Sequence, residues 1–370
     1  MTNIAELTSM VKEFPGLPPD EGKIIHVSTI DEIILEIEEA EDHTTIIIAK
    51  GHYLMPRDIL LTSHYVTIRG ETGNRDDVIL DFDSEFDDTN PKQSERIGAV
   101  SILKISHAKN VTIANLTVAN SPKYGILFLA DSKIHNLKIL NIKFHNIWAR
   151  GLKGTHPGRL DDQNTEFGEG YGLPCAERFE VIRPIGGEVR NCLFICDTIK
   201  KNDKDAFDGD YIAGMDMMGV KDWVIADNVF VGLRGKNGGG RGGVFIWQWS
   251  EGVTIENNIF VDCDKGVAFG NPSAMNKCDY HIKGGSIINN LFKGGTNKAI
   301  EIQYCGDIEV KDNRIISKDR TNFASIQVLD SISPVTISNN KIHKGACDEF
   351  NIDDKAIEKE NEIGDFESKF

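Results

Sequence analysis

The stretch Val253-Thr254-Ile255-Glu256-Asn257-Asn258-Ile259-Phe260 shows the pattern on which the fold depends: an aliphatic or β-branched run, an Asn and a second aliphatic pair. Seven other segments share this pattern, and the weakest of them has Cys192 in the position of the Asn. They begin at Val111, Ile139, Val189, Val224, Ile287, Ile308 and Val335. A short pattern that returns at such spacings predicts a solenoid of stacked repeats.

Each copy is typical of a strand, a tight bend at Asn and a second strand, because β-branched residues suit a pleated surface and Asn tolerates a left-handed bend. A third strand precedes the pair, as in residues 243–248 and 299–304. Three short strands cannot bury their apolar faces in one coil, but stacked coils that pair in parallel can. We therefore expect an all-β parallel β-helix, with the Asn side chains of successive coils hydrogen-bonded in a ladder. The frame of leucine-rich repeats is absent.

From about residue 46 to residue 342 the chain resembles the right-handed parallel β-helix proteins of the pectate-lyase-like superfamily. The segment before it, residues 26–37, has Ser28 or Thr29 as a helix N-cap, an acidic residue three positions on and apolar residues at helical spacing. It resembles the N-terminal capping helix of such solenoids and is expected near residues 29–40. The superfamily includes lyases, hydrolases, epimerases, esterases and structural proteins, so the resemblance implies the fold and leaves the reaction open.

The predicted domain organisation is simple. We expect an N-terminal extension over residues 1–24, a single β-helix domain over residues 25–346 and an acidic C-terminal tail over residues 347–370. Long insertions interrupt the coil pattern at residues 148–178, 195–213 and 233–242. All three are expected to emerge along one edge of the solenoid, and long loops on a rigid scaffold are common places for binding and catalysis.

Composition excludes several classes of partner. The formal net charge of −16 argues against nucleic acid, which requires a basic surface. No stretch is long and apolar enough to span a membrane. The first residues lack a secretory signal, which predicts a cytoplasmic protein, or a secreted one if a leader was removed. The seven cysteines form no Cys-x-x-Cys pair, which favours free thiols. The oligomeric state stays open.

Alignment of the coils by their Asn bends predicts which residues of the third strand face outward. The residues expected to face the core are Met215, Met217, Phe245, Trp247, Ile300 and Ile302. The expected outward column is Lys104, Ala130, Glu180, Asp216, Ile246 and Glu301, with Ile182, Met218, Gln248 and Gln303 beside it. Glu180 and Asp216 would then be stacked carboxylates, which suits an acid and base pair or a calcium site. A solvated polar row is the alternative.

The insertions supply cations near this face. Lys153 and His156 lie in the first, and the glycine-rich run of residues 233–243 carries Arg234, Lys236 and Arg241. That run lacks the ending of a phosphate-binding loop, so we expect a mobile lid over a sugar chain instead. Its arginines would bind a substrate carboxylate by paired hydrogen bonds.

A cation site is a further possibility. Residues 203–210 have the acidic density of a calcium loop but depart from the EF-hand frame. Asp208, Asp210 and Asp216 are the candidate calcium ligands, and a solvated acidic loop is the alternative. The cysteines and histidines show no zinc spacing.

These observations favour an enzyme that acts on an oligo- or polysaccharide, a lyase that cleaves a uronic-acid-containing glycan by β-elimination in a groove on the first sheet. The candidate catalytic residues are Lys153, His156, Asp216, Arg234 and Arg241. The candidate substrate-binding residues are Glu180, Lys221, Lys236, Gln248, Trp249, Glu301 and Gln303. A glycoside hydrolase with Glu180 and Asp216 as its carboxylate pair is the first alternative. A non-catalytic β-helix that binds a glycan or a partner is the second.

Overall fold

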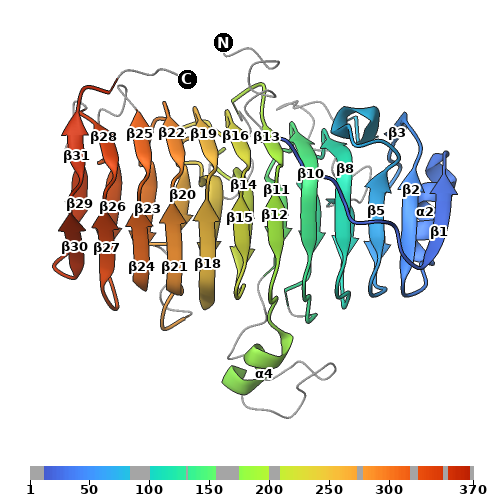
Figure 1. Ribbon diagram of the computed structural model, residues 1–370, viewed down its shortest axis with the longest axis horizontal. Helices are drawn as coiled ribbons and strands as arrows, with labels where there is room; N and C mark the ends of the chain where they lie inside the picture. Colours follow the sequence, from blue (N-terminus) through green and yellow to red (C-terminus); the bar gives the residue numbers. More distant parts are fainter. Residues whose placement is uncertain are drawn as a thin grey trace. The chain divides into compact units, whose positions relative to one another are not determined.

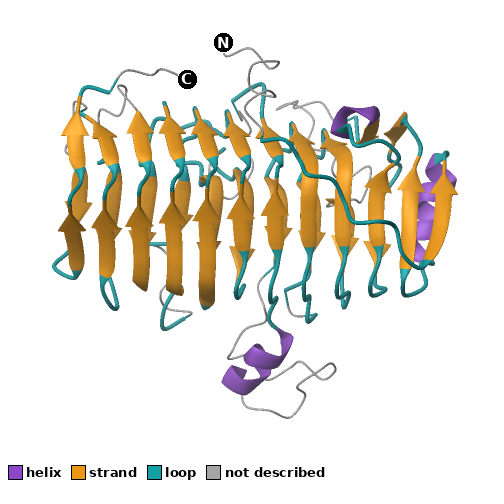
Figure 2. Cartoon of the chain, viewed as in Figure 1, coloured by secondary structure: helices purple, strands orange, loops and turns teal. Residues whose placement is uncertain are grey.

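The computed structural model describes residues 12–83, 101–130, 132–155, 175–199, 209–272, 278–316, 324–344 and 349–366. The chain forms two compact units. We call them the N-terminal unit, residues 13–192 and 217–223, and the C-terminal unit, residues 193–216 and 224–370 together with residues 1–12. Each unit is built of short parallel strands stacked coil on coil (Figures 1 and 2). The predicted right-handed parallel β-helix with three strands per coil is confirmed.

In each coil a strand of one sheet, sheet B, is followed by two strands of a second sheet, sheet A, with a bend between them. In the N-terminal unit the sheet B strands are β4 (Ile59–Leu61), β7 (Ser101–Ile105), β9 (Tyr124–Phe128) and β11 (Arg150–Gly154). The sheet A strands are β1 (Lys23–Val27), β2 (Thr44–Ile48), β3 (Gly51–Leu54), β5 (Thr67–Gly70), β6 (Val78–Asp81), β8 (Thr112–Ala119), β10 (Lys138–His145) and β12 (Glu188–Arg190). A short 3-10 helix, η1 (Arg75–Asp77), precedes β6.

The C-terminal unit repeats the same three-strand coil. Its sheet B strands are β14 (Ala213–Met218, whose last two residues belong to the N-terminal unit), β17 (Gly242–Trp247), β20 (Val267–Phe269), β23 (Ile300–Gln303), β26 (Ile326–Leu329) and β29 (Phe350–Ile352). Its sheet A strands are β13 (Leu193–Ile195), β15 (Val224–Ala226), β16 (Val229–Val231), β18 (Ser250–Glu256), β19 (Ile259–Val261), β21 (Ile282–Ile288), β22 (Leu291–Lys293), β24 (Cys305–Lys311), β25 (Arg314–Ile316), β27 (Val335–Ser338), β28 (Lys341–His343), β30 (Ala356–Lys359) and β31 (Glu362–Gly364). Strands β29 to β31 lie beyond residue 346, in the segment expected to be an acidic tail.

The predicted capping helix is α2 (Ile30–Glu38), in the N-terminal unit. Thr29 is its N-cap, and a capping box joins Thr29 and Glu32, because each side chain is bonded to the backbone of the other residue. The helix buries Ile33, Ile34 and Ile37 and contacts β1, β2 and β4. Its apolar face therefore covers strands that would otherwise end the stack. No helix in the described part of the chain is long and apolar enough to cross a membrane.

The Asn ladder runs through six coils of the C-terminal unit. Each Asn donates from Nδ2 to Oδ1 of the next, over 2.9 to 3.0 Å. Its members are Asn228, Asn258, Asn290, Asn313, Asn340 and Asn361. The left-handed residue of each bend is the one before the ladder Asn, as at Asp227, Asn257 and Asn289. The two residues of each bend therefore have different roles. The first adopts the positive φ that turns the chain, and the second supplies the buried side-chain amide that forms the hydrogen bonds.

Phenylalanines stack beside this ladder. The rings of Phe194, Phe230, Phe260 and Phe292 follow one another with centroids 4.8 Å apart, which is the distance between neighbouring strands. Each ring comes from the strand after a bend, two residues beyond the ladder position. The core of the C-terminal unit is therefore an aromatic stack next to an amide stack, both repeated at the coil spacing.

The first insertion lies between different strands of the coil from those expected. Residues 150–154, placed by the sequence inside the first insertion, form β11. The segment expected to be the following strand forms instead part of helix α4 (Cys175–Ile182). This insertion therefore follows a sheet B strand, whereas those at residues 196–212 and 232–241 precede one. The sequence Arg-Gly-Leu-Lys-Gly of β11 has no β-branched residue, and its identity as a strand comes from its pairing with β9.

Replacing a ladder Asn should destabilise the protein strongly. Asn290 donates to the carbonyls of Ile255 and Ile288 and accepts from the Asn258 backbone N–H, so Asn290→Ala orphans several buried polar groups. We expect a loss of about 2–4 kcal/mol in the free energy of unfolding, read from urea unfolding curves.

The matched control is Asn289→Gly, at the exposed left-handed position next to it. Gly accepts a positive φ without strain, so the loss there should stay below about 1 kcal/mol. An equal decrease in the free energy of unfolding in the two variants would show that the ladder hydrogen bonds do not contribute this stability.

Candidate functional site

Register places one column of side chains on the outer face of sheet B in the C-terminal unit. Its members are Phe245, Ala268, Glu301, Gln327 and Asn351. The neighbouring columns, which begin at Val244 and Ile246, consist of fully buried aliphatic and aromatic residues that face the core. Glu301 therefore faces outward as predicted. The predictions for Phe245 and Ile246 are wrong, since the two are exchanged.

The exchange has a local cause. Both Gln248 and Trp249, in the turn after β17, have a positive φ, whereas the turn after β23 has Tyr304 alone in this conformation. Ser250 and Cys305 occupy the same register position, so the turn after β17 is one residue longer. Counting backward from the Asn bend thus moves the β17 side chains to the wrong face.

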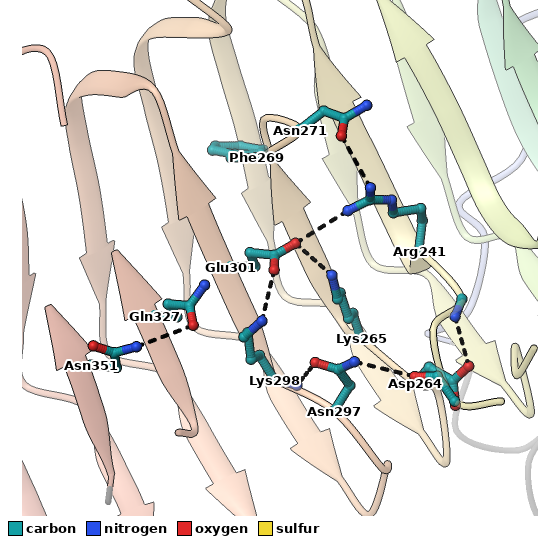
Figure 3. A network of polar contacts seen from close by, with 12 residues as sticks. Arg241, Asp264, Lys265, Phe269, Asn271, Asn297, Lys298, Glu301, Gln327 and Asn351 are labelled. Carbon is teal, nitrogen blue, oxygen red and sulfur yellow. Dashed lines mark hydrogen bonds and ion pairs between the residues drawn. The ribbon is translucent and has the colours of Figure 1, made fainter. Parts of the chain in front are cut away.

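Glu301 is the centre of a buried ionic cluster (Figure 3). Its carboxylate lies 2.5 Å from Lys265 Nζ, 2.9 Å from Lys298 Nζ and 3.4 Å from Arg241 Nη1. Arg241 also donates from Nη2 to Asn271 Oδ1, over 3.1 Å. Glu301 is only 2% exposed. Each cation lies within two residues of the start of a sheet B strand, in three consecutive coils, so the coil spacing brings them together.

Three cations surround one carboxylate, and this imbalance sets the pKa values. Burial alone would raise the pKa of Glu301, but the ammonium groups of Lys265 and Lys298 outweigh it and hold the pKa at about 2. The pKa of Lys265 is lowered to about 8, chiefly by burial, because the charges of Arg241 and Lys298, which lower it, act against Glu301, which raises it. Glu301 is therefore ionised throughout the neutral range, while Lys265 loses its proton at a lower pH than an ordinary lysine.

An aromatic pair lies next to the cluster. The guanidinium of Arg241 sits 4.9 Å from the centre of the Phe245 ring, and Phe245 stacks on Trp247 with centroids 5.3 Å apart. The indole Nε1–H of Trp247 donates to Asp216 Oδ1, over 3.1 Å. Trp247, predicted to face the core, is half-buried on this outer face. Asp216 is 2% exposed and holds the indole in place.

The glycine-rich loop is fastened to carboxylates of the same unit, which contradicts the expectation of a mobile lid. Asp264 Oδ2 accepts from the backbone N–H groups of Gly235 and Gly240, and Asp210 Oδ1 accepts from that of Asn237. Asp264 is fully buried, and burial raises its pKa despite these bonds. The glycines are needed because a Cβ on Gly239 would come within 2.5 Å of Asp210.

Most of the other residues predicted as site residues in the C-terminal unit are buried or paired with a carboxylate, and Lys236 is exposed. Trp249 is 6% exposed, so its indole is packed and is not an open surface for a sugar. Gln248 is also buried, and Gln303 donates to Asp330. Arg234 lies 3.7 Å from Asp264, so it braces the loop, while Lys236 is exposed at the loop tip.

The remaining predicted residues lie in the N-terminal unit. Glu180 is exposed on α4, not on a sheet B strand, and pairs with Arg183 at 2.7 Å and Lys221 at 3.8 Å. Its predicted place in the outward column is therefore wrong. Lys153 is buried in β11, beside Leu127 of β9. His156 lies outside the described residues.

Two of the three predicted calcium ligands lie among the described residues. Asp210 and Asp216 each accept a hydrogen bond from a protein N–H group, and Asp208 lies outside the described residues. Throughout the described ranges, no three His, Cys, Asp or Glu side chains lie close enough together to hold a metal. Cys192, Cys196, Cys263, Cys278 and Cys305 are buried and form no disulfide.

Sequence reasoning missed Lys265, Lys298 and Asp264. None lies in a strand, and the spacing of the strands says nothing about short turn segments. A usable signal existed for two of the cations, because Arg241 and Lys298 each fall one or two residues before a predicted third strand. Residues at the same position before the sheet B strands of successive coils are stacked into a column, so this placement predicts a column of cations.

Comparisons with known proteins agree with this architecture. The family described as "Periplasmic copper-binding protein (NosD)" matches residues 197–357. No curated protein sequence matches the chain. The chain is a parallel β-helix repeat protein.

Three solved structures illustrate the shared fold. The PL6 family alginate lyase AlyGC is 14% identical, with 86% of this chain and 38% of that chain covered and a TM-score of 0.54. PfbA, a surface adhesin of Streptococcus pneumoniae, is 13% identical over 92% of this chain and 79% of that chain, with a TM-score of 0.52. The tailspike protein of E. coli bacteriophage HK620, in complex with a pentasaccharide, is 9% identical over 92% and 57%, with a TM-score of 0.54. This chain thus spans well under half of the alginate lyase.

Removing the charge of Glu301 should be costly. Glu301→Gln leaves three buried or half-buried cations without their counter-ion, and we expect a loss of about 3–5 kcal/mol in the free energy of unfolding. Because the pKa of Glu301 is lowered to about 2, the stability from its ionised form is fully present at neutral pH. It declines as the pH falls from about 4.3 toward 2, so the difference between wild type and variant should be smaller at about pH 3 than at about pH 7.

Glu309→Gln is the control for this experiment, because Glu309 is 48% exposed and lies 4.0 Å from Lys311. It should change stability by less than about 0.5 kcal/mol. Adding Lys265→Met to Glu301→Gln should recover part of the loss, since one unpaired buried cation is then gone. A difference between wild type and Glu301→Gln that does not change with pH would contradict the assigned pKa.

Proposed function

We propose that this chain is a polysaccharide lyase that cleaves a uronic-acid-containing glycan by β-elimination at the outer face of sheet B in the C-terminal unit. The observation that carries the proposal is Lys265, an amine with a pKa lowered to about 8 within a cluster of two further cations and one carboxylate. Such an amine is a general base suited to near-neutral pH. The surplus of positive charge around it suits an acidic substrate.

The step needs a base, a carboxylate-binding group and a departing oxygen. Neutral Lys265 takes the proton from the ring carbon that bears the carboxylate. The electron pair left behind forms the new carbon–carbon double bond as the glycosidic carbon–oxygen bond breaks, and the leaving oxygen takes a proton from water. Arg241 and Lys298, the two more exposed cations, bind the carboxylate and stabilise the negative charge that develops on it.

The remaining groups of the site position these three cations. Glu301 holds Lys265, Lys298 and Arg241 around one carboxylate, so it is a positioning residue rather than a substrate contact. Trp247, held by Asp216, presents a half-buried indole next to Phe245, the ring that Arg241 contacts, and a sugar ring can stack there. A ring on Trp247 with its carboxylate toward Arg241 uses both features at once.

The comparisons support a glycan as the ligand. One solved structure with the same fold is an alginate lyase, and another contains a pentasaccharide. The matched family is described as periplasmic, which favours a secreted over a cytoplasmic location. Polymeric glycans of this kind occur outside the cytoplasm, so a periplasmic location is consistent with the proposed substrate.

Copper, which the family description names, does not fit the donors that the described residues of this chain offer. His281 and Cys278 lie 3.3 Å apart, but the ring nitrogens of His281 are bonded to the Gln248 N–H and the Asn271 carbonyl. Burial lowers the pKa of His281 to about 4 and raises that of Cys278 to about 11. The proposed step therefore uses cationic side chains and no metal.

A non-catalytic glycan-binding β-helix is the second candidate. It is favoured by the burial of Lys265, which is 5% exposed, because a base must reach the carbon it deprotonates. The glycoside hydrolase alternative has lost its basis, since it required Glu180 and Asp216 on adjacent sheet B strands.

Lys265→Met should abolish elimination while preserving the fold. We expect turnover to fall by about 10²–10⁴-fold, as for loss of a general base. The measurement is the ultraviolet absorbance of the unsaturated product during incubation with galacturonate, mannuronate and guluronate polymers. Lys341→Met, on sheet A, is the control and should keep full activity. Binding of these polymers without any unsaturated product in the wild type would leave the binding-only candidate.

The pH dependence of the reaction should report the same amine. Because Lys265 must be neutral to act, kcat/KM is expected to rise with pH and to level off above about 8. Glu301→Gln removes the group that favours the charged amine, so the midpoint of this rise should move to lower pH. A profile that falls over this range would rule out an amine base.

A further inference from the structure

The N-terminal unit contains a second groove that the proposed reaction does not use. It is a cavity of about 340 Å³, bounded on one side by residues 17–22 and on the other by sheet A. We call residues 17–22 the strap. In Figure 1 the dark blue segment that contains the strap passes over β10, β8 and β5, and these strands together with β2 supply residues of the cavity wall. A cavity of this size accommodates a small ligand.

The strap is held in place by specific bonds, so the cavity is preformed. The carboxylate of Asp20 accepts two hydrogen bonds from Arg69, which lower the pKa of Asp20, and Thr45 Oγ1 donates to the Glu21 carbonyl. Pro18 and Pro19 restrict the backbone between these anchors. Gly22 has a φ of +76°, and a Cβ there would come within 1.9 Å of the His43 carbonyl.

A column of polar side chains forms the floor of the cavity. Thr45, Thr67, Thr112 and Lys138 occupy the same register position in successive coils. Neighbouring members are about 4.8 Å apart, so the stretch from Thr67 to Lys138 spans about 10 Å. Within the described ranges, the hydroxyls of Thr67 and Thr112 have no hydrogen-bond partner and the ammonium of Lys138 has no ion-pair partner. The floor therefore offers two free hydroxyls and one free cation in line.

An aromatic pair lies at the edge of the cavity. The rings of His43 and Tyr65 are stacked, with centroids 4.4 Å apart and planes 8° from parallel. Tyr65 is 51% exposed, so its outer face is open to solvent. By contrast Trp249, another aromatic residue with a positive φ, is 6% exposed. Tyr65 is thus an exposed ring whose position is fixed by its neighbour.

Tyr65 has a backbone conformation that is energetically unfavourable for an aromatic residue. Its φ is +56°, a left-handed conformation that Asn tolerates well and aromatic residues adopt rarely. The next two coils have Asn110 and Asn136 in the equivalent position, and Asn136 Nδ2 donates to Asn110 Oδ1 over 2.8 Å. The chain therefore carries an exposed aromatic ring where an Asn would suit the backbone better, and such departures from local preference mark functional positions.

We infer that this groove binds an acidic pyranose of a glycan chain, at a site separate from the lyase centre. The ring of the sugar stacks on Tyr65, as aromatic side chains and sugar rings pack face to face. Its hydroxyls bond to Thr67 and Thr112, and the carboxylate of the same or the next sugar reaches Lys138. The spacing of the floor matches about two sugar units, and the free ammonium sets the preference for an acidic sugar over a neutral one.

Hydrogen–deuterium exchange tests this site directly. The probes are tetrasaccharides of galacturonate, mannuronate and guluronate, with maltotetraose as the neutral counterpart, added to full-length protein carrying Lys265→Met so that no probe is cleaved. At least one acidic probe should slow exchange in peptides that cover the strap and residues 64–68. Half-saturation should require about tenfold less of that probe than of maltotetraose.

Two variants in the same background identify the contacts. Tyr65→Asn keeps the left-handed backbone and removes the ring, so it should weaken the protection about tenfold without lowering the thermal midpoint. Lys138→Met should remove the preference for the acidic probe and leave weak binding of maltotetraose. Protection by none of the three acidic probes, or protection unchanged by Tyr65→Asn, would overturn the inference.

The binding experiment at the strap and the test of the lyase proposal have separate outcomes. Tyr65→Asn in an otherwise wild-type chain should keep the rate of product formation on a tetrasaccharide, whereas Lys265→Met should keep the protection of the strap. Loss of both properties in either single variant would show that the two sites are not separate and would overturn the inference.

Discussion

The structure depends on how the buried bend of each coil satisfies its backbone polar groups. A chain that turns inside a stack exposes N–H and C=O groups to an apolar interior, where an unpaired group is costly. In the C-terminal unit the ladder amides solve this problem by bonding both to the bend and to the next coil. The Asn at each bend thereby sets the distance and register of the neighbouring sheet A strands.

The same periodicity that stabilises the core also concentrates charge on the surface. Arg241, Lys265 and Lys298 come from three consecutive coils, and stacking places them around Glu301. An arrangement of three cations and one carboxylate is electrostatically unbalanced, so the nearly buried amine of Lys265 has a lowered pKa. A rigid stack can hold such an arrangement because each group is fixed by its own coil, and this is the condition under which preorganised charge is useful for catalysis.

The two candidate sites use the repeat in different ways. The cluster on sheet B joins side chains from turns before the strands, and it is closed and strongly charged. The groove on sheet A joins side chains within the strands, Thr67 and Thr112 among them, and it lies between the sheet and the strap. A lyase that holds its polymer at one place and cleaves it at another gains local substrate concentration, so the two proposals are compatible while resting on separate observations.

Sequence reasoning predicted what depends on near neighbours. The coil pattern, the ladder and the capping box of Thr29 and Glu32 all follow from short segments, and all are present. It failed where one residue changes a count. The extra left-handed residue in the turn at Gln248 and Trp249 exchanged Phe245 with Ile246, and a segment without β-branched residues concealed β11, which displaced Glu180 onto a strand it does not occupy. Turn length and helix content inside an insertion are not visible in a repeat pattern.

By itself the sequence determined that this chain is a parallel β-helix, because each repeat carries its own strands and its own bend residue. Only the tertiary structure decided which charged side chains meet. Lys265 and Glu301 are 36 residues apart and their pairing arises from the stacking of coils, whose register depends on every turn between them. It also decided that Trp249 is buried while Tyr65 is open to solvent, because exposure depends on what packs over a residue and not on the residue itself.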